Sequence, residues 1–197
     1  MTIPHLQKPG AGLPFIEGIV IRYIYYPLAM RRFSWLGSLR EMVADTEKII
    51  ALVQPLSETQ FKTRVLIDRL TALEDSSRYW SAAMTLDHLM ITMRGMTHIV
   101  AELAAGRPFI NKTGTADVKP DADTLPLKEE MIVTFRQCAA DCAARLMPLA
   151  AAAAAGNKAQ HPFFGMIPAR GWVFVLGAHQ KLHRVQIAKI IKGLPNA

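Results

Sequence analysis

The segment from Trp172 to Ile190 constrains the fold more than any other part of the chain. Its apolar side chains recur at spacings of three and four residues, the period at which positions share one face of an α-helix. Two histidines and a glutamine on this face need polar partners, because buried polar groups are nearly always hydrogen bonded. The segment therefore predicts a core-facing helix. The face comprises Trp172, Leu176, His179, His183, Gln186 and Ile190.

His179 and His183 lie one helical turn apart on this face. At this spacing two imidazole nitrogens can reach one metal ion at about 2.0–2.1 Å. A pair of this kind also occurs as ordinary surface or core histidines. The metal-site interpretation therefore depends on a third ligand from elsewhere in the chain.

Composition favours helix throughout the chain. The sequence has 197 residues, 51% of them hydrophobic, which is enough for one domain with a sizeable core. Alanine and leucine are abundant and alternating β-branched runs are scarce, a balance typical of helices. We predict an all-α protein with an N-terminal arm over residues 1–37 and a single four-helix-bundle domain over residues 38–197.

His88 provides the third candidate ligand. It lies on the core-facing stripe of a predicted helix that opens at Ser81, its N-cap, and ends near Gly106. His98 lies about 80° off this stripe and is a flank residue. Three neutral imidazoles with one open position are typical of catalytic or ligand-exchanging metal sites. Gln186 can hydrogen-bond a ligand, a bound water or an outer-shell group.

Two further helices complete the predicted domain. One runs from Ser38 to the residue before Pro55, and the other from Leu127 to Ala155 with an interruption at Pro148. Residues 107–126 form a long connecting loop. Residues 161–165 form a tight aromatic turn before the last helix.

The net charge of +7 is concentrated at the two ends of the sequence, and residues 168–197 contain five basic residues and no acid. An anionic ligand near the last helix and plain surface charge both explain this distribution. No nucleic-acid-binding motif accompanies the charge, so we expect no nucleic-acid partner.

The two cysteines and the apolar segments predict which groups are buried and where the protein is located. Cys138 and Cys142 share a helical stripe with Phe135, which predicts buried core thiols. No segment has the length of a membrane span or the pattern of a signal peptide, so we expect a cytoplasmic protein. Residues 15–30 are apolar and aromatic, and we expect them to cover the domain or to contribute to a homodimer interface.

The chain lacks the motifs that several known kinds of metal and nucleotide site require. A zincin needs glutamate after the first histidine as its general base, and Gln180 stands there. A ferritin-like di-iron bundle needs Glu-x-x-His, which the chain lacks. The glycine-rich phosphate-binding patterns are also absent.

The ordered motifs resemble the DinB-like superfamily. They are Trp80-Ser81, then Asp87-His88-Leu89, and near the C-terminus His179-x-x-x-His183-x-x-Gln186. The turn His161-Pro-Phe-Phe-Gly165 is similar to one branch of bacterial DinB-like proteins. The resemblance covers roughly residues 38–192. Leu182 departs from it, since relatives often carry another histidine there, and the N-terminal extension has no match.

This resemblance implies a four-helix bundle, often dimeric, that holds a divalent metal such as zinc or nickel. Carried over to this chain, the ligands are His88, His179 and His183, and Gln186 matches a position that is usually glutamine. Characterised relatives include S-transferases that use bacillithiol or glutathione-like thiols and a mycothiol-dependent maleylpyruvate isomerase.

Three functional hypotheses follow from the sequence. The first is a metal-dependent S-transferase that joins a low-molecular-weight thiol to a small electrophile. The second is a non-catalytic metal-binding bundle that acts through dimerisation or a protein partner. The third makes the histidines core residues without a metal.

Overall fold

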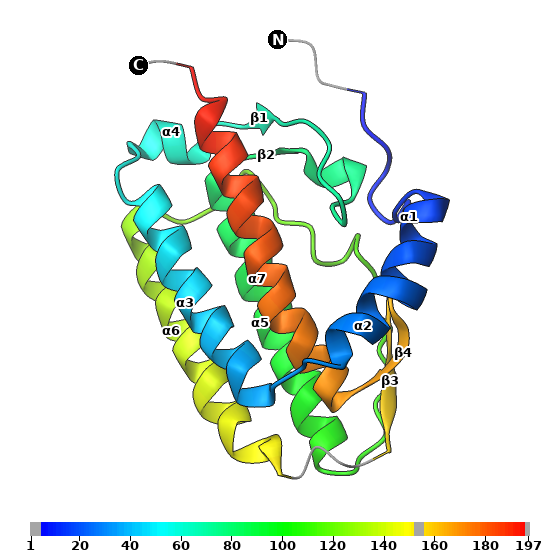
Figure 1. Cartoon of the computed structure of the whole chain (residues 1–197). Helices are drawn as coiled ribbons and strands as arrows, with labels where there is room; N and C mark the ends of the chain where they lie inside the picture. Colours follow the sequence, from blue (N-terminus) through cyan, green and yellow to red (C-terminus); the bar gives the residue numbers. More distant parts are fainter. Residues whose placement is uncertain (1–4, 152–155, 196–197) are drawn as a thin grey trace.

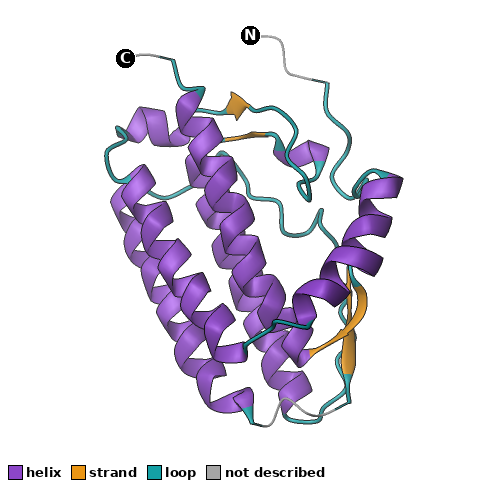
Figure 2. Cartoon of the chain, viewed as in Figure 1, coloured by secondary structure: helices purple, strands orange, loops and turns teal. Residues whose placement is uncertain are grey.

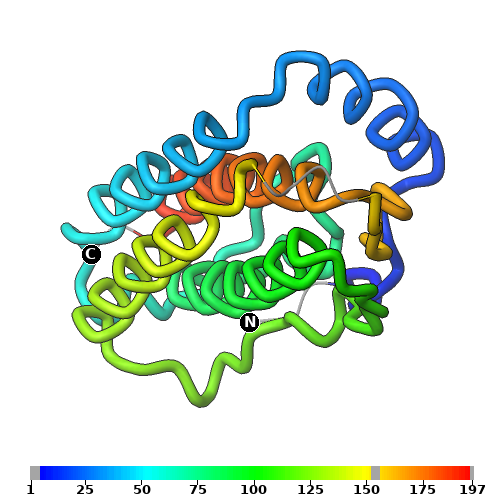
Figure 3. The backbone as a smooth tube through the Cα atoms, turned by 90° about the horizontal axis from the view of Figure 1, so that it is seen from below, coloured from blue at the N-terminus to red at the C-terminus, as the bar shows by residue number. Residues whose placement is uncertain are grey.

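Four long helices form the body of the protein. The computed structural model describes residues 5–151 and 156–195, and these are predominantly helical (Figures 1 and 2). Helix α3 packs against α6 and α7, and α5 packs against the same two helices, so the four surround a common core (Figure 3). Their bounds are α3 Trp35–Val53, α5 Ala82–Ala104, α6 Lys128–Leu146 and α7 Ala169–Lys192. Within the described residues, no helix is long and apolar enough to cross a membrane.

The helices begin and end where side chains satisfy their free backbone groups. The Ser81 hydroxyl accepts a hydrogen bond from the Met84 N–H and caps α5, as the sequence predicts. Gly106 follows α5 with a positive φ of 75°, the left-handed geometry that glycine adopts without strain. Helix α3 starts three residues before the predicted Ser38, because Ser34 is its N-cap.

The connection from α3 to α5 contains short elements. Helix α4 (Glu58–Lys62) opens with a reciprocal capping box between Ser57 and Gln60, which the Ser-x-x-Gln pattern predicts. Strand β1 (Val65–Leu66) then pairs antiparallel with β2 (Tyr79–Trp80). A 3₁₀ turn (Asp75–Ser77) lies between the two strands.

A second antiparallel pair precedes α7. Strands β3 (Lys158–His161) and β4 (Gly165–Pro168) flank the predicted aromatic turn. An all-α description therefore misses two small sheets, which are too short to show the alternating pattern of longer strands.

The predicted third helix is shorter than expected. Helix α6 ends at Leu146, and Pro148 lies in a 3₁₀ turn over Met147–Ala150. The alanine run that prolongs the predicted helix falls mainly at residues 152–155, outside the described residues. Cys138 and Cys142 are buried on α6, as predicted.

The N-terminal segment forms a continuous helical stretch beside α7 and the β3–β4 hairpin (Figure 1). It consists of α1 (Phe15–Val20), a π-helical turn (Ile21–Tyr25) and α2 (Tyr26–Met30). The Tyr26 ring packs on Phe164 and Phe174. Gly171 makes room for the Tyr26 hydroxyl, because a Cβ at this position would collide with it.

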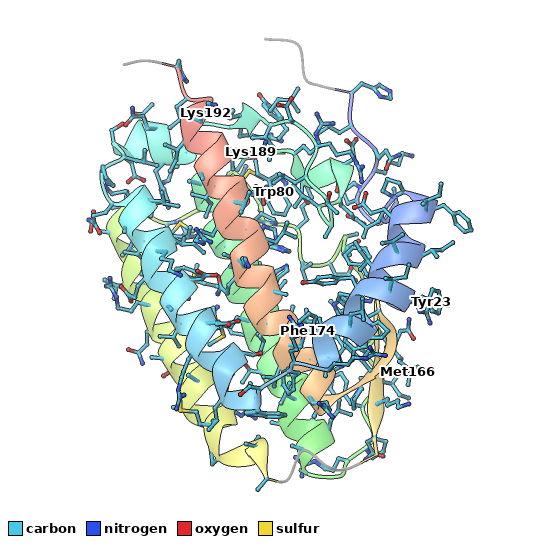
Figure 4. All side chains as sticks on the ribbon, in the orientation of Figure 1. Tyr23, Trp80, Met166, Phe174, Lys189 and Lys192 are labelled. Carbon is cyan, nitrogen blue, oxygen red and sulfur yellow. The ribbon has the colours of Figure 1, made fainter. Side chains whose placement is uncertain are left out.

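One face of this segment remains exposed. Phe15 is 82% exposed and Tyr23 is 64% exposed. Figure 4 shows Tyr23 pointing away from the helical body, whereas Phe174 lies between α7 and the N-terminal helices. The segment therefore covers the domain with one side and offers apolar groups to the outside with the other.

Candidate metal centre

Helices α5 and α7 bring the three predicted histidines together. His88 lies in the second turn of α5, while His179 and His183 lie in the middle of α7. One ring nitrogen from each histidine lies within 4.8 Å of the ring nitrogens of the other two. His88 and His183 are buried, and His179 is half-buried. The structure thus places three imidazoles where they can hold one metal ion.

Two of the distances between the Nε2 atoms are close to those expected around a shared ion. The Nε2 atom of His179 lies 3.2 Å from that of His88 and 3.0 Å from that of His183. Nitrogens bound tetrahedrally to zinc at about 2.0–2.1 Å are about 3.3–3.4 Å apart. These two contacts therefore need only a small relaxation of the rings to accommodate the ion, and the ligand atoms of His88 and His183 lie within 4.8 Å of each other.

Hydrogen bonds outside the triad turn two Nε2 lone pairs inward. The Nδ1 atom of His88 lies 2.8 Å from the carbonyl oxygen of Val118, which can only accept, so Nδ1 carries the hydrogen. The Gln186 amide group donates from Nε2 to the Ser77 carbonyl at 2.8 Å. Its oxygen therefore accepts from Nδ1 of His183 at 2.6 Å. Both neutral rings then present unprotonated Nε2 atoms to His179.

A bound cation satisfies the three Nε2 atoms better than hydrogen bonds among the three rings do. A hydrogen on Nε2 of His179 can point at one of its neighbours and leaves the second lone pair without a partner. A divalent ion satisfies all three lone pairs, and the outer hydrogen bonds hold the rings in the orientation that binding requires.

Burial keeps the triad in its neutral, metal-binding form. It lowers the pKa of His88 to about 4 and, together with the neighbouring His88 ring, lowers the pKa of His183 to about 3. Burial and then the adjacent His183 and His88 hold the pKa of His179 well below its usual value. Since a protonated imidazole cannot bind a metal, these shifts extend metal binding to mildly acidic pH.

A cavity of about 730 Å³ opens onto the triad. Its walls come from the N-terminal segment, the loop after α5, the β3–β4 hairpin, α5 and α7. Trp80 forms part of the wall and stacks parallel to His183, with the ring centroids 6.3 Å apart. The size is that of a site for a small organic molecule.

Sequence reasoning placed some neighbours of the triad and missed others. Gln186 hydrogen-bonds the Nδ1 atom of His183 from outside the triad, which is one of the roles that the sequence predicts for it. The Val118 carbonyl was missed, because a backbone group in an irregular loop leaves no side-chain signal. His98 is exposed, packs against Phe109 and lies outside the triad.

No protein-family model, curated protein or solved structure matches the chain. The case for a metal site therefore depends on the geometry of the three histidines and their hydrogen-bond partners.

Proposed function

We propose that the protein is a metal-dependent enzyme of the DinB-like type that transfers a low-molecular-weight thiol to a small electrophile in the cytoplasm. In this proposal the helices α3, α5, α6 and α7 form the four-helix bundle of that superfamily. His88, His179 and His183 bind one zinc or nickel ion. The observation that carries the proposal is the convergence of three Nε2 atoms at an open cavity, two of them oriented by outer hydrogen bonds.

An exogenous nucleophile is needed, because the cysteines of this chain are unsuitable. Cys138 and Cys142 lie on α6 and are absent from the cavity wall. Burial raises the pKa of Cys142 to about 11, so its reactive thiolate form is rare at neutral pH. We therefore propose an exogenous thiol as the nucleophile, which a metal held by His88, His179 and His183 would activate.

Each component of the cavity has a role in this proposal. A bound divalent metal lowers the pKa of a coordinated thiol and supplies it as the thiolate at neutral pH. Lys181 lies at the cavity wall and is exposed, so it can pair with an anionic group of the thiol. Arg184 is engaged elsewhere, because its guanidinium group lies 3.2 Å from the buried Asp45 carboxylate.

Thiol transfer can be tested with the metal-loaded protein. We expect it to consume one of bacillithiol, glutathione and mycothiol in the presence of 1-chloro-2,4-dinitrobenzene or monochlorobimane, and to lose this activity on chelation. His183→Ala should remove the activity, because it deletes one ligand, whereas His98→Ala should retain it. If no thiol is consumed faster than with the apo-protein, the non-catalytic hypothesis is preferred.

The exposed apolar face of the N-terminal segment favours the second hypothesis, in which a metal-binding bundle acts through dimerisation. Five of its apolar residues are more than half exposed and absent from the cavity wall. Large exposed apolar patches mark interaction sites, and a second copy of the chain is the partner that we propose. The five residues are Phe15, Ile16, Tyr23, Ile24 and Leu28.

Dimer formation through this face has a direct test. We expect the wild-type protein to have the mass of a dimer by light scattering, and a variant with serine at Phe15, Ile16, Tyr23 and Ile24 to have the mass of a monomer. These positions are exposed, so their substitution leaves the interior unchanged. Serine at the exposed Val133 of α6 is the matched control. A folded quadruple variant that remains dimeric would exclude this face as the interface.

A further inference from the structure

His161 is a second kind of histidine in the cavity. It lies at the end of β3, outside the metal triad, and its side chain forms part of the cavity wall. The residue is only 7% exposed. It packs between Phe164 and Trp172, with centroids 4.8 Å and 5.0 Å away. These contacts hold the ring in one orientation.

The hairpin turn fixes the tautomer of this ring. The backbone N–H groups of Phe163 and Phe164 lie 3.1 Å and 3.3 Å from Nδ1 of His161 and donate to it. An acceptor nitrogen carries no hydrogen, so a neutral ring carries its hydrogen on Nε2. Burial lowers the pKa of His161 to about 3, which keeps the ring neutral at physiological pH.

The Nε2–H group of His161 is a donor that the described part of the chain leaves without an acceptor. Among the described residues, none accepts a hydrogen bond from Nε2 of His161, although the turn uses Nδ1 twice. Nε2 lies at the tip of the ring, away from the backbone that holds Nδ1. Donors in largely buried positions normally have partners, and the cavity is the space where an acceptor can lie.

The walls around this donor are mainly apolar. They therefore favour an apolar molecular body, and the uncharged Nε2–H group of His161 favours an uncharged acceptor atom. The apolar wall residues include Ile91, Met96, Ile99, Phe164, Val175 and Leu182.

We propose that His161 donates a hydrogen bond from Nε2 to the carbonyl-type oxygen of an uncharged, mainly apolar ligand in the cavity beside the metal triad. The inference builds on the proposed function by naming the class of small molecule that the cavity takes. Binding of this ligand needs neither the thiol nor the metal. The inference can therefore be tested separately from thiol transfer.

Two matched probes distinguish the hydrogen bond from apolar packing. 2-Acetylnaphthalene carries a carbonyl group, and 2-isopropenylnaphthalene has a methylene group in place of its oxygen. We expect equilibrium dialysis of the full chain to show roughly 3- to 10-fold tighter binding of the ketone, the range of one neutral hydrogen bond. The measurement is made without thiol, on metal-free and zinc-loaded protein.

The variant His161→Asn removes the donor and preserves the turn. The asparagine Oδ1 atom can take the place of Nδ1 and accept from the two backbone N–H groups, but no donor reaches the position of Nε2. We expect the preference for the ketone to disappear, with the affinity for the alkene and the zinc content unchanged.

Nuclear magnetic resonance of the wild-type protein gives a second readout that needs no variant. Long-range ¹H–¹⁵N spectra should show His161 as the Nε2–H tautomer, and only the ketone should shift its Nε2 resonance. Equal or absent binding of the two probes by the wild type, a preserved preference in His161→Asn, or the Nδ1–H tautomer would each overturn the inference. Failure of thiol transfer alone would not affect it.

Discussion

Replacing His183 by alanine is expected to weaken zinc binding more than about 100-fold. Loss of an outer hydrogen-bond partner typically reduces metal affinity by roughly 10–100-fold, and loss of a ligand removes a metal bond as well. The same result is expected for His88→Ala and His179→Ala, because the Nε2 atoms of all three residues converge on one position. Competition with a chromophoric chelator measures the affinities.

Two further variants make this comparison specific. His98→Ala should bind zinc like the wild type, because His98 is exposed and lies outside the triad. Gln186→Ala should reduce affinity by roughly 10–100-fold, because it removes the acceptor that orients His183. A triple histidine variant that retains full metal content would show that the metal site has been assigned to the wrong residues.

Removal of the metal is expected to lower the melting temperature by about 8–16 °C. A ligand that binds only the folded state at about 1,000 times its Kd stabilises that state by about 4.1 kcal/mol. In a chain of this size each kcal/mol corresponds to about 2–4 °C. The three ligands come from two helices and meet only in the folded protein, so the unfolded chain binds metal weakly.

Thermal unfolding in the presence of excess zinc and of a chelator measures this difference. The triple variant, with alanine at His88, His179 and His183, is the control, and its melting temperature should be the same in both conditions. Equal melting temperatures for the wild-type protein would favour the hypothesis that the histidines are core residues without a metal.

The parts of the fold that were predicted correctly have strong local signals. The apolar period along Trp172–Ile190 predicts α7, and Ser81 and Gly106 mark the two ends of α5. The strands and the start of α3 were missed. The strands have two to four residues, too few for a period. Helix α3 begins at a cap that precedes the apolar period.

The candidate site was predictable to a similar extent. Side chains at fixed helical spacing identify His179, His183 and Gln186, and the core-facing stripe of α5 identifies His88. The sequence could not show that these side chains meet, because the way in which α5 and α7 pack depends on the whole chain. The role of His161 depends on two backbone N–H groups in the hairpin turn, which a side-chain pattern cannot show.

We expect one divalent metal to bind to the Nε2 atoms of His88, His179 and His183. X-ray absorption spectroscopy of the protein loaded with one equivalent of zinc identifies the ligands of the ion. We expect three imidazole nitrogens at about 2.0–2.1 Å and one further light-atom ligand in the open position. A spectrum with fewer than three imidazoles, or with oxygen ligands alone, would contradict metal binding by these three histidines.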